Sequence, residues 1–437
     1  MEDILVAAAP NTSYFTPAQD PPAGTAFDPQ PDGRSIPKLF QPLQIRGLRM
    51  QNRILVRRFL TVLDAYSPDC TTQLSPMVTQ SAEDGKITPY HKTHIGGILT
   101  FGPGLSFMEG ASITPEGRGT PQDVGLWDDS QIEPLRELVE YAHSQNQKIG
   151  IQINHAGRKG STVALWLARH AISTEAVGGW PDKLLAPSAI AYSPGDPVPT
   201  ELDKEGIQRI KKAWTEAAVR AVKAGFDAID IHGAHGYLLH QFMSPVTNKR
   251  TDKYGGSFEN RIRLAVEIVD AVRELMPEDM PLFFRVSATD WLEEVAPNEP
   301  SWCCEDTVRL AEILADHGVD VCDVSSGGLD PRQKIVVQES AYQARFAVAV
   351  KKRVGGRMLV SSVGGIKHAT IAQEVLNRDI DMVLVGRQFL RDHQTVWTFA
   401  EQLGVDVKLP NQVAWVFAGR GNQQSKVTKE KESKDRA

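Results

Sequence analysis

Short apolar runs alternate with amphipathic segments along most of the chain, from about Leu39 to Leu390. This alternation is typical of parallel strands that are joined by helices. It predicts eight strands, at Arg53–Leu55, just before Glu109, and at Ile149–Asn154, Phe226–Ile231, Pro281–Val286, Val319–Ser325, Met358–Val363 and Met382–Gly386. Eight such units favour the α/β class and a (β/α)8 TIM barrel, which typically takes about 250 residues plus insertions. A doubly wound sheet is the alternative.

The segments between these runs have a helical period. In Leu202–Ala224, apolar and small side chains recur at i, i+3 and i+4, which predicts one buried helix face. We expect Thr200 to cap this helix and Gly225 to end it. The same pattern predicts helices at Ile132–Gln145, Phe258–Leu275 and Asp306–His317.

The two ends of the chain differ from this central part. Residues 1–35 are rich in proline among small and acidic residues, a mixture that buries too little apolar surface to order itself. We therefore predict a flexible N-terminal arm at 1–35, a barrel at 36–410 and a C-terminal extension at 411–437. The residues from Ser425 onward are nearly all charged or polar, which predicts a disordered tail.

Charge and cysteine usage narrow the classes of function. The formal net charge is −6 and the pI is near 6.0, so we predict no nucleic-acid partner. The cysteines Cys70, Cys303, Cys304 and Cys322 form neither a disulfide framework nor a CxxC metal pattern, which favours a reducing compartment. No apolar run approaches the roughly 18 residues that span a membrane, and Ile4–Ala9 is too short for a signal peptide. We expect a cytoplasmic protein without a membrane partner; homo-oligomerisation stays open.

A cluster of polar groups follows the apolar run FDAIDI. His232, His235 and Tyr237 lie at the end of this predicted strand and in the turn after it. Active sites of barrels form at the carboxyl ends of the strands, so these side chains can reach one small molecule. Their spacing alone leaves open that they only pack in the core. A metal site is disfavoured, because no third ligand residue is placed nearby.

The sequence around this cluster resembles a known enzyme family. The run HGYLLHQFxSPxxNxRTDxYGGSxENRxR, at residues 235–263, is similar to the Old Yellow Enzyme family of FMN-dependent ene reductases, in its bacterial-type and fungal branch. The resemblance implies FMN as cofactor and NADPH, or NADH, as hydride donor. It implies an enone-type substrate, an α,β-unsaturated carbonyl compound whose activated double bond is reduced. In that reaction His232 and His235 donate hydrogen bonds to the carbonyl oxygen, and Tyr237 delivers a proton.

The resemblance also implies the residues that contact FMN. Ser75, Pro76 and Met77 would lie against the flavin, and the backbone of Gly110 would approach its ring. Gln152 would bind the pyrimidine edge and Arg285 the N1 and C2 carbonyl region, although spacing alone favours an internal salt bridge for Arg285. The phosphate would be bound after the last two strands by Gly364, Gly365, Gly386 and Arg387.

Two positions depart from the family pattern. Val78 and Gln80 stand where the bacterial-type branch has a cysteine and a tyrosine. The redox potential and substrate shape of that branch are therefore not expected for this chain. The reverse dehydrogenation, an isomerisation in the same site and a flavin-poor inactive relic remain alternatives. Clustered cysteines of an iron–sulfur variant are missing from the sequence.

The run Val56–Gln73 interrupts the first strand and its loop. Without it, Asn52–Leu55 would join Leu74–Met77 as NRILLSPM, a natural first strand. The segment begins with valine and ends with glutamine, whose codons can carry the borders of a short in-frame intron. We interpret residues 56–73 as an insertion or a retained intron, with a genuine loop as the alternative; entropy does not decide, since doubling a loop costs only about 0.6 kcal/mol.

Overall fold

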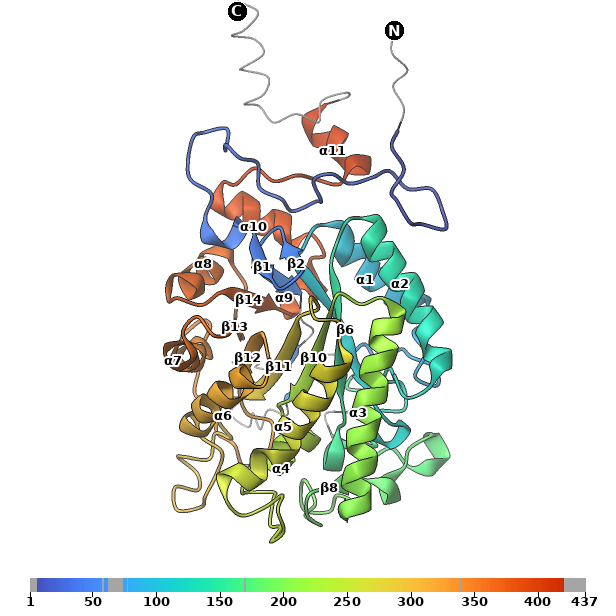
Figure 1. The fold of residues 1–437 in the computed structure, drawn as a ribbon, viewed down its shortest axis with the longest axis vertical. Helices are drawn as coiled ribbons and strands as arrows, with labels where there is room; N and C mark the ends of the chain where they lie inside the picture. Colours follow the sequence, from blue (N-terminus) through green and yellow to red (C-terminus); the bar gives the residue numbers. More distant parts are fainter. Residues whose placement is uncertain are drawn as a thin grey trace, which may run out of the picture.

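Eight parallel strands close into a barrel in the computed structural model (Figure 1). The structure describes residues 6–56, 59–61, 74–76, 78–168, 170–337 and 339–419. In barrel order the strands are β3 (Ile54–Val56), β6 (Leu105–Ser112), β7 (Ile149–Asn154), β10 (Ala228–Gly233), β11 (Leu282–Ser287), β12 (Val321–Ser325), β13 (Leu359–Val363) and β14 (Met382–Val385). Closure confirms the predicted TIM barrel and excludes the doubly wound sheet. The observed strands differ from the predicted ones mainly by one or two residues at their ends.

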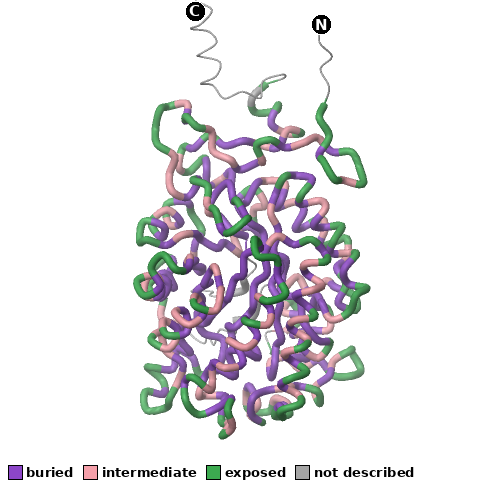
Figure 2. Tube along the Cα trace, in the orientation of Figure 1, coloured by how far each residue is buried: buried purple, intermediate pink, exposed green. Residues whose placement is uncertain are grey.

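The strands are apolar on both faces because both faces are buried (Figure 2). One apolar cluster fills the barrel, where the rings of Phe107 and Phe283 meet edge to face with centroids 5.0 Å apart. A larger cluster lies between the strands and the surrounding helices. These helices are α1 (Pro89–Thr100), α2 (Ile132–Ser144), α3 (Lys204–Ala224), α5 (Phe258–Leu275), α6 (Cys304–Asp316), α7 (Ala344–Val354), α8 (Ala369–Asn377) and α10 (Thr395–Leu403).

The N-terminus of α3 corrects one prediction. Asp203, rather than Thr200, caps this helix, and its carboxylate accepts a hydrogen bond of 2.7 Å from the backbone N–H of Gly206. Thr200 instead lies in the short strand β9 (Thr200–Glu201), which pairs with β8 (Leu185–Ala186). Gly225 ends the helix with a φ of 92°, as predicted.

The N-terminal segment packs against the barrel, so the expected flexible arm is not what residues 6–35 form. Its backbone pairs with the segment after α10: Gly24 N–H donates to Lys408 at 2.8 Å and Phe27 N–H to Asp406 at 3.0 Å. In Figure 1 this segment and α11 (Asn411–Ala418) lie together across one end of the barrel. Local composition carries no information about these partners, which lie almost 400 residues away in the sequence, and for this reason it predicted disorder. The side-chain bond from Gln19 to Gln412 is an example.

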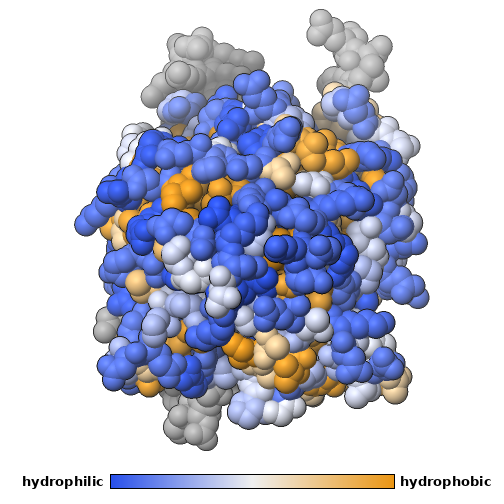
Figure 3. Space-filling view, turned by 60° about the horizontal axis from the view of Figure 1, so that its bottom comes forward, coloured by the Kyte–Doolittle hydropathy of each residue, from blue (hydrophilic) through white to orange (hydrophobic). Residues whose placement is uncertain are grey.

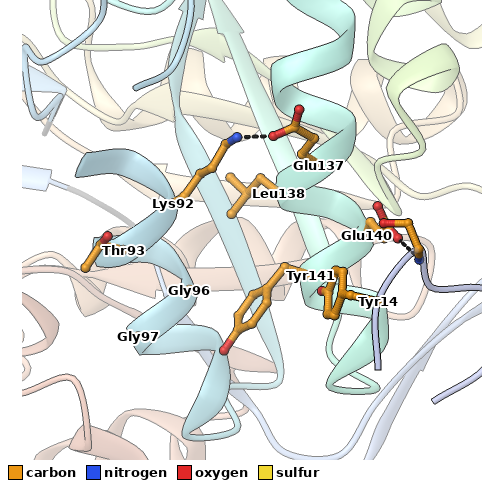
Figure 4. A pocket seen from close by; sticks show the side chains of 10 residues that line it. Tyr14, Lys92, Thr93, Gly96, Gly97, Glu137, Leu138, Glu140 and Tyr141 are labelled. Carbon is orange, nitrogen blue, oxygen red and sulfur yellow. Dashed lines mark hydrogen bonds and ion pairs between the residues drawn. The ribbon is translucent and has the colours of Figure 1, made fainter. Parts of the chain in front are cut away.

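The same segment borders a pocket on the side of the barrel (Figure 4). Tyr14 donates a hydrogen bond of 3.2 Å from its hydroxyl to Ser144, at the end of α2. The pocket, of about 550 Å³, lies between this segment, α1 and α2, where Lys92 pairs with Glu137. It is therefore separate from the carboxyl ends of the strands, where we expect the site.

Two predicted segments lie partly or wholly outside the described residues. Of residues 56–73, the structure describes Val56 and β4 (Phe59–Thr61), whose backbone pairs antiparallel with β5 (Leu74–Pro76). The interpretation as an insertion or retained intron stays a prediction. The charged tail from 420 to 437 also lies outside the described residues. Among those described, no helix is long and apolar enough to cross a membrane.

Candidate active site

A layer of buried polar side chains lies inside the barrel, toward the carboxyl ends of its strands. Strand pairing places Asp230 level with Gln152, and His232 level with Arg285. On the next strand Asp323 is level with Arg285. All five side chains are buried. Buried polar groups cost free energy unless they bond to one another, and this layer is built from such bonds.

The two histidines present neighbouring ring nitrogens. The amide nitrogen of Gln152 donates to Asp230 at 2.6 Å and lies 3.1 Å from His232 Nδ1. If this amide donates to Nδ1, the proton of His232 is on Nε2. Nε2 of His232 lies only 3.3 Å from Nδ1 of His235. The two nitrogens are therefore close enough to bind the same oxygen atom.

His235 is fixed from both its backbone and its ring. Its φ is 58°, and its N–H donates to the hydroxyl of Ser287 at 2.9 Å. Its Nε2 lies 2.8 Å from the hydroxyl of Ser325. Burial, followed by the positive charge of Arg285, lowers the pKa of His235 well below its ordinary value. The ring is consequently neutral near pH 7, with one proton to donate.

Tyr237 completes the predicted catalytic group. Its ring meets that of His232 edge to face, with centroids 5.2 Å apart, and only 3 % of the residue is exposed. It precedes α4 (Leu238–Met243) at the N-cap position. A Cβ at position 119 would come 3.3 Å from the Tyr237 hydroxyl and 3.0 Å from a carboxylate oxygen of Asp123, so a glycine there avoids crowding the hydroxyl. The structure thus brings His232, His235 and Tyr237 together.

Arg285 forms a buried ion pair inside the barrel. Its Nε lies 3.1 Å from a carboxylate oxygen of Asp323, and neither side chain is exposed. The hydroxyl of Ser361 donates to the other oxygen at 3.1 Å. The spacing-based interpretation of Arg285 as an internal salt bridge agrees with this arrangement. A contact with flavin stays a prediction.

A hollow at the ends of β13 and β14 gathers the predicted phosphate residues. Gly364 and Gly365 have φ values of 105° and 71°, which disfavour any residue with a side chain. A Cβ at Gly364 would also come 2.3 Å from the amide nitrogen of Gln343. Backbone amides and two basic side chains around such a hollow suit an anion. It is lined by Val363, Gly364, Gly365, Ile366, Lys367, Leu384, Gly386, Arg387 and Gln388.

The loop after the first strand is only partly described. Ser75 and Pro76 belong to β5, and Met77 lies outside the described residues. The next residues are anchored: Thr79 N–H donates to Glu109 at 2.7 Å, and the side-chain oxygen of Gln80 accepts from the backbone N–H of Leu165 at 2.9 Å. The first bond fixes the loop against β6, and the second fixes it against the segment after β7.

Gly110 follows Glu109 on β6. A Cβ at Gly110 would come 2.2 Å from the amide nitrogen of Asn154, so only glycine fits there without a shift. Glu109 itself bonds to His91 at 2.9 Å, with both side chains fully buried. The structure therefore places Gly110 at a close approach, whereas its predicted contact with flavin stays a prediction.

Several residues around the site were not predicted from the sequence. They are Asp230, Glu109, His91, Lys159 and Ser325, and each bonds directly to a predicted residue, to the first-strand loop or to the backbone of the site. For Lys159 a signal was present: HAGRKG directly follows the strand Ile149–Asn154, where polar residues face a barrel's site. The others needed the fold, because Asp230, Glu109 and Ser325 come from separate strands and His91 comes from α1.

We predict that Ser325→Ala lowers the affinity for an oxyanion ligand. The Ser325 hydroxyl lies 2.8 Å from His235 Nε2 and 3.4 Å from the side-chain oxygen of Gln343. When it donates to Nε2, the proton of His235 is on Nδ1, toward His232. Without it, the proton can move to Nε2 and face away from the ligand. One lost charge-assisted bond corresponds to about 1.5 kcal/mol or more, roughly tenfold in Kd. Titration with phenol measures this, and Ser326→Ala is the matched control, since Ser326 shares with Ser325 the bond to Gln343 but does not contact the ring of His235. Equal affinity in both variants would contradict the assignment.

Comparisons with known proteins cover nearly all of the barrel. Residues 38–405 match the model of the NADH:flavin oxidoreductase / NADH oxidase family. An NADH:flavin oxidoreductase of Gibberella zeae is 51 % identical over 420 residues, covering 95 % of this chain and 96 % of that protein. An NADPH dehydrogenase of Bacillus subtilis is 36 % identical over 376 residues, with coverages of 86 % and 98 %.

Solved structures share the architecture. Morphinone reductase in complex with tetrahydroNAD aligns with a TM-score of 0.65 and 25 % identity, over 86 % of this chain and 93 % of that one. A 2-naphthoyl-CoA reductase complex aligns with a TM-score of 0.69 over 83 % of this chain and 52 % of that one; at 21 % identity it shows the fold alone. The chain therefore belongs to the NADH:flavin oxidoreductase family, that of Old Yellow Enzyme, and is an FMN-dependent oxidoreductase that uses a nicotinamide cofactor.

Proposed function

We propose that this enzyme reduces the activated carbon–carbon double bond of a small α,β-unsaturated carbonyl compound, with NADPH or NADH as the source of hydride. The observation that carries the proposal is the 3.3 Å separation of His232 Nε2 and His235 Nδ1, beside the buried phenol of Tyr237. FMN, when bound, would supply the redox chemistry, hydride transfer between the nicotinamide and the substrate. The residues of this chain orient the substrate and supply the proton.

The histidines bind the carbonyl oxygen of the substrate. This oxygen gains negative charge when hydride reaches the β-carbon, and two hydrogen-bond donors aimed at it stabilise that charge. Burial and the positive charge of Arg285 lower the pKa of His235, so its ring donates as a neutral imidazole. The ring of His232 is oriented by Gln152, and that of His235 by Ser325.

Tyr237 supplies the proton that completes the reduction. Its O–H bond breaks as a C–H bond forms at the α-carbon, and the resulting tyrosinate recovers a proton from water. With the end of the barrel that carries this site turned forward, the surface is mostly hydrophilic, with apolar groups in scattered patches (Figure 3).

The polar layer and the hollow would hold FMN. Gly364, Gly365 and the basic groups Lys367 and Arg387 fit the phosphate, because the hollow offers backbone amides and positive charge. Arg285 would stabilise negative charge on the reduced ring, and its pairing with Asp323 keeps it inside the barrel.

The test of the function is enone reduction by the full chain loaded with FMN. We expect NADPH or NADH to be consumed with cyclohexenone and with a maleimide, and cyclohexanone to accumulate from the former. Cyclohexanone itself should cause no consumption. Nicotinamide oxidation that is the same with and without an enone would contradict the proposal.

We predict that His232→Ala and His235→Ala weaken the binding of phenol, whose oxygen mimics the charged carbonyl oxygen. Each lost donor to a charged oxygen should cost roughly 1.5 to 3 kcal/mol, or about 10- to 150-fold in Kd. The long-wavelength absorption of the phenol–flavin complex measures the binding. His143→Ala is the control, since His143 is an exposed residue of α2. Wild-type affinity in both site variants would place the oxyanion site elsewhere.

A further inference from the structure

Lys159 lies beside the catalytic group that we propose. It ends the short turn Gly157–Lys159 that follows β7. Its ammonium donates to the backbone carbonyls of His235 at 2.9 Å and Gly328 at 2.8 Å. The same ammonium lies 5.9 Å from the ring centre of Tyr237 and 4.9 Å from that of Tyr192. A positive charge is thus held at a fixed place next to the proton donor.

The surroundings make this charge sensitive to pH. Burial, followed by the neighbouring charge of Arg158, lowers the pKa of Lys159 from 10.5 to about 7. Arg158 stays charged, with a pKa of about 10, and bonds to the carbonyls of Ile190, Ala191 and Leu329. The ammonium form of Lys159 therefore predominates below pH 7 and the neutral amine above it.

Other ionisable groups lie near Lys159 and Tyr237. Their effect on the pH dependence must be distinguished from that of Lys159. Arg158 acts directly on Lys159. Tyr192, Asp196, Asp290 and Asp330 act on Arg158, and His232, His240 and Arg285 act on His235. Asp123 lies beside the Tyr237 hydroxyl. Asp123 matters most among them: burial raises its pKa to about 6, and one of its oxygens flanks the same empty position at Gly119 as the Tyr237 hydroxyl.

We propose that Lys159 is a positioning residue that stabilises the tyrosinate formed when Tyr237 gives up its proton. The inference rests on the proposed function. As the Tyr237 O–H bond breaks, the electron pair stays on the phenolic oxygen, and the ammonium attracts the new negative charge. The hydrogen bonds from Lys159 to His235 and Gly328 keep the charge in place, because both partners belong to the loops around the site.

The size of the effect follows from the distance. A unit charge 5.9 Å from the centre of the phenol ring, at an effective dielectric constant of about 20, changes the acidity of the phenol by roughly 100-fold. About half of such a change is expressed in the rate of proton transfer, so a factor of about ten is expected. The amine can still donate both hydrogen bonds when it is neutral, so the pH change removes the charge and leaves the geometry.

The experiment measures the reoxidation of reduced enzyme by cyclohexenone, in stopped flow, from pH 6 to 8. We expect the wild-type rate to fall about tenfold as the pH rises, with a midpoint near 7. Lys159→Met should show the low rate throughout, and Lys159→Arg should remove the step because its charge persists. Asp123→Asn and Lys249→Met should keep the fall in rate with rising pH. Lys249 is a control because it bonds to the carbonyl of Pro245, apart from Tyr237.

A second measurement does not depend on turnover. Acetic anhydride reacts only with the neutral amine, so its labelling of Lys159 reports the loss of the charge. Labelling against pH, read by mass spectrometry, should have a midpoint near 7. A midpoint near 10.5, or a step that persists in Lys159→Met, overturns the inference while leaving the function intact. No reoxidation by cyclohexenone in the wild type at any pH refutes the proposed function, and this inference with it.

Discussion

Tyr237→Phe is expected to slow the reduction of cyclohexenone by about 10²- to 10⁴-fold, the usual contribution of a general acid. Phenylalanine keeps the ring that packs edge to face on His232 but lacks the proton. Reduction of the flavin by NADPH should stay within about twofold of wild type, because that half of the cycle needs no proton from this residue. Stopped-flow measurement of the two halves separates them.

The control for this variant is Tyr254→Phe. Tyr254 is also a buried tyrosine with a bonded hydroxyl, which donates to Glu267 at 3.1 Å, but it lies behind α4 in the apolar layer against α5. We expect both halves of the cycle to be unchanged in it. If Tyr237→Phe slows both halves equally, the residue has a structural role and the assignment of the proton donor is wrong.

Asp323→Ala is expected to lower the free energy of unfolding by about 3 to 5 kcal/mol. The substitution leaves the guanidinium of Arg285 inside the barrel, fully buried and without its carboxylate. Urea unfolding of the flavin-free protein measures the effect, since a bound cofactor would add its own stabilisation. The double variant Arg285→Met with Asp323→Leu should recover most of the loss, because it removes both charges and keeps apolar volume.

A surface ion pair gives the matched comparison. Asp316 bonds to Arg357 at 3.0 Å, with side-chain exposures of 63 % and 44 %. Asp316→Ala should therefore cost less than about 1 kcal/mol, since solvent screens the pair. Equal losses for Asp316→Ala and Asp323→Ala would show that burial does not strengthen the inner pair.

The sequence by itself determined the barrel and where its candidate site would be assembled. Strands buried on both faces are mostly apolar, so β7 and β10 can be recognised in the sequence as IGIQIN and AIDIHG. The few polar residues inside or directly after these runs indicate the candidate site. Because parallel strands end at one face, His232, His235 and Tyr237 had to lie there. Helix α5 was predicted with its observed ends, since Ser257 caps it and its apolar period is regular.

Only the tertiary structure decided which residues pair across the chain. Asp203 caps α3, whereas Thr200 belongs to β9, which pairs with β8. The segment 6–35 forms backbone hydrogen bonds with residues after α10. The bonds from Lys159 to His235 and from Arg285 to Asp323 join separate strands and loops. Local periodicity reports which face of an element is buried. It cannot report which distant group meets a buried polar atom, because that depends on the register and closure of the barrel.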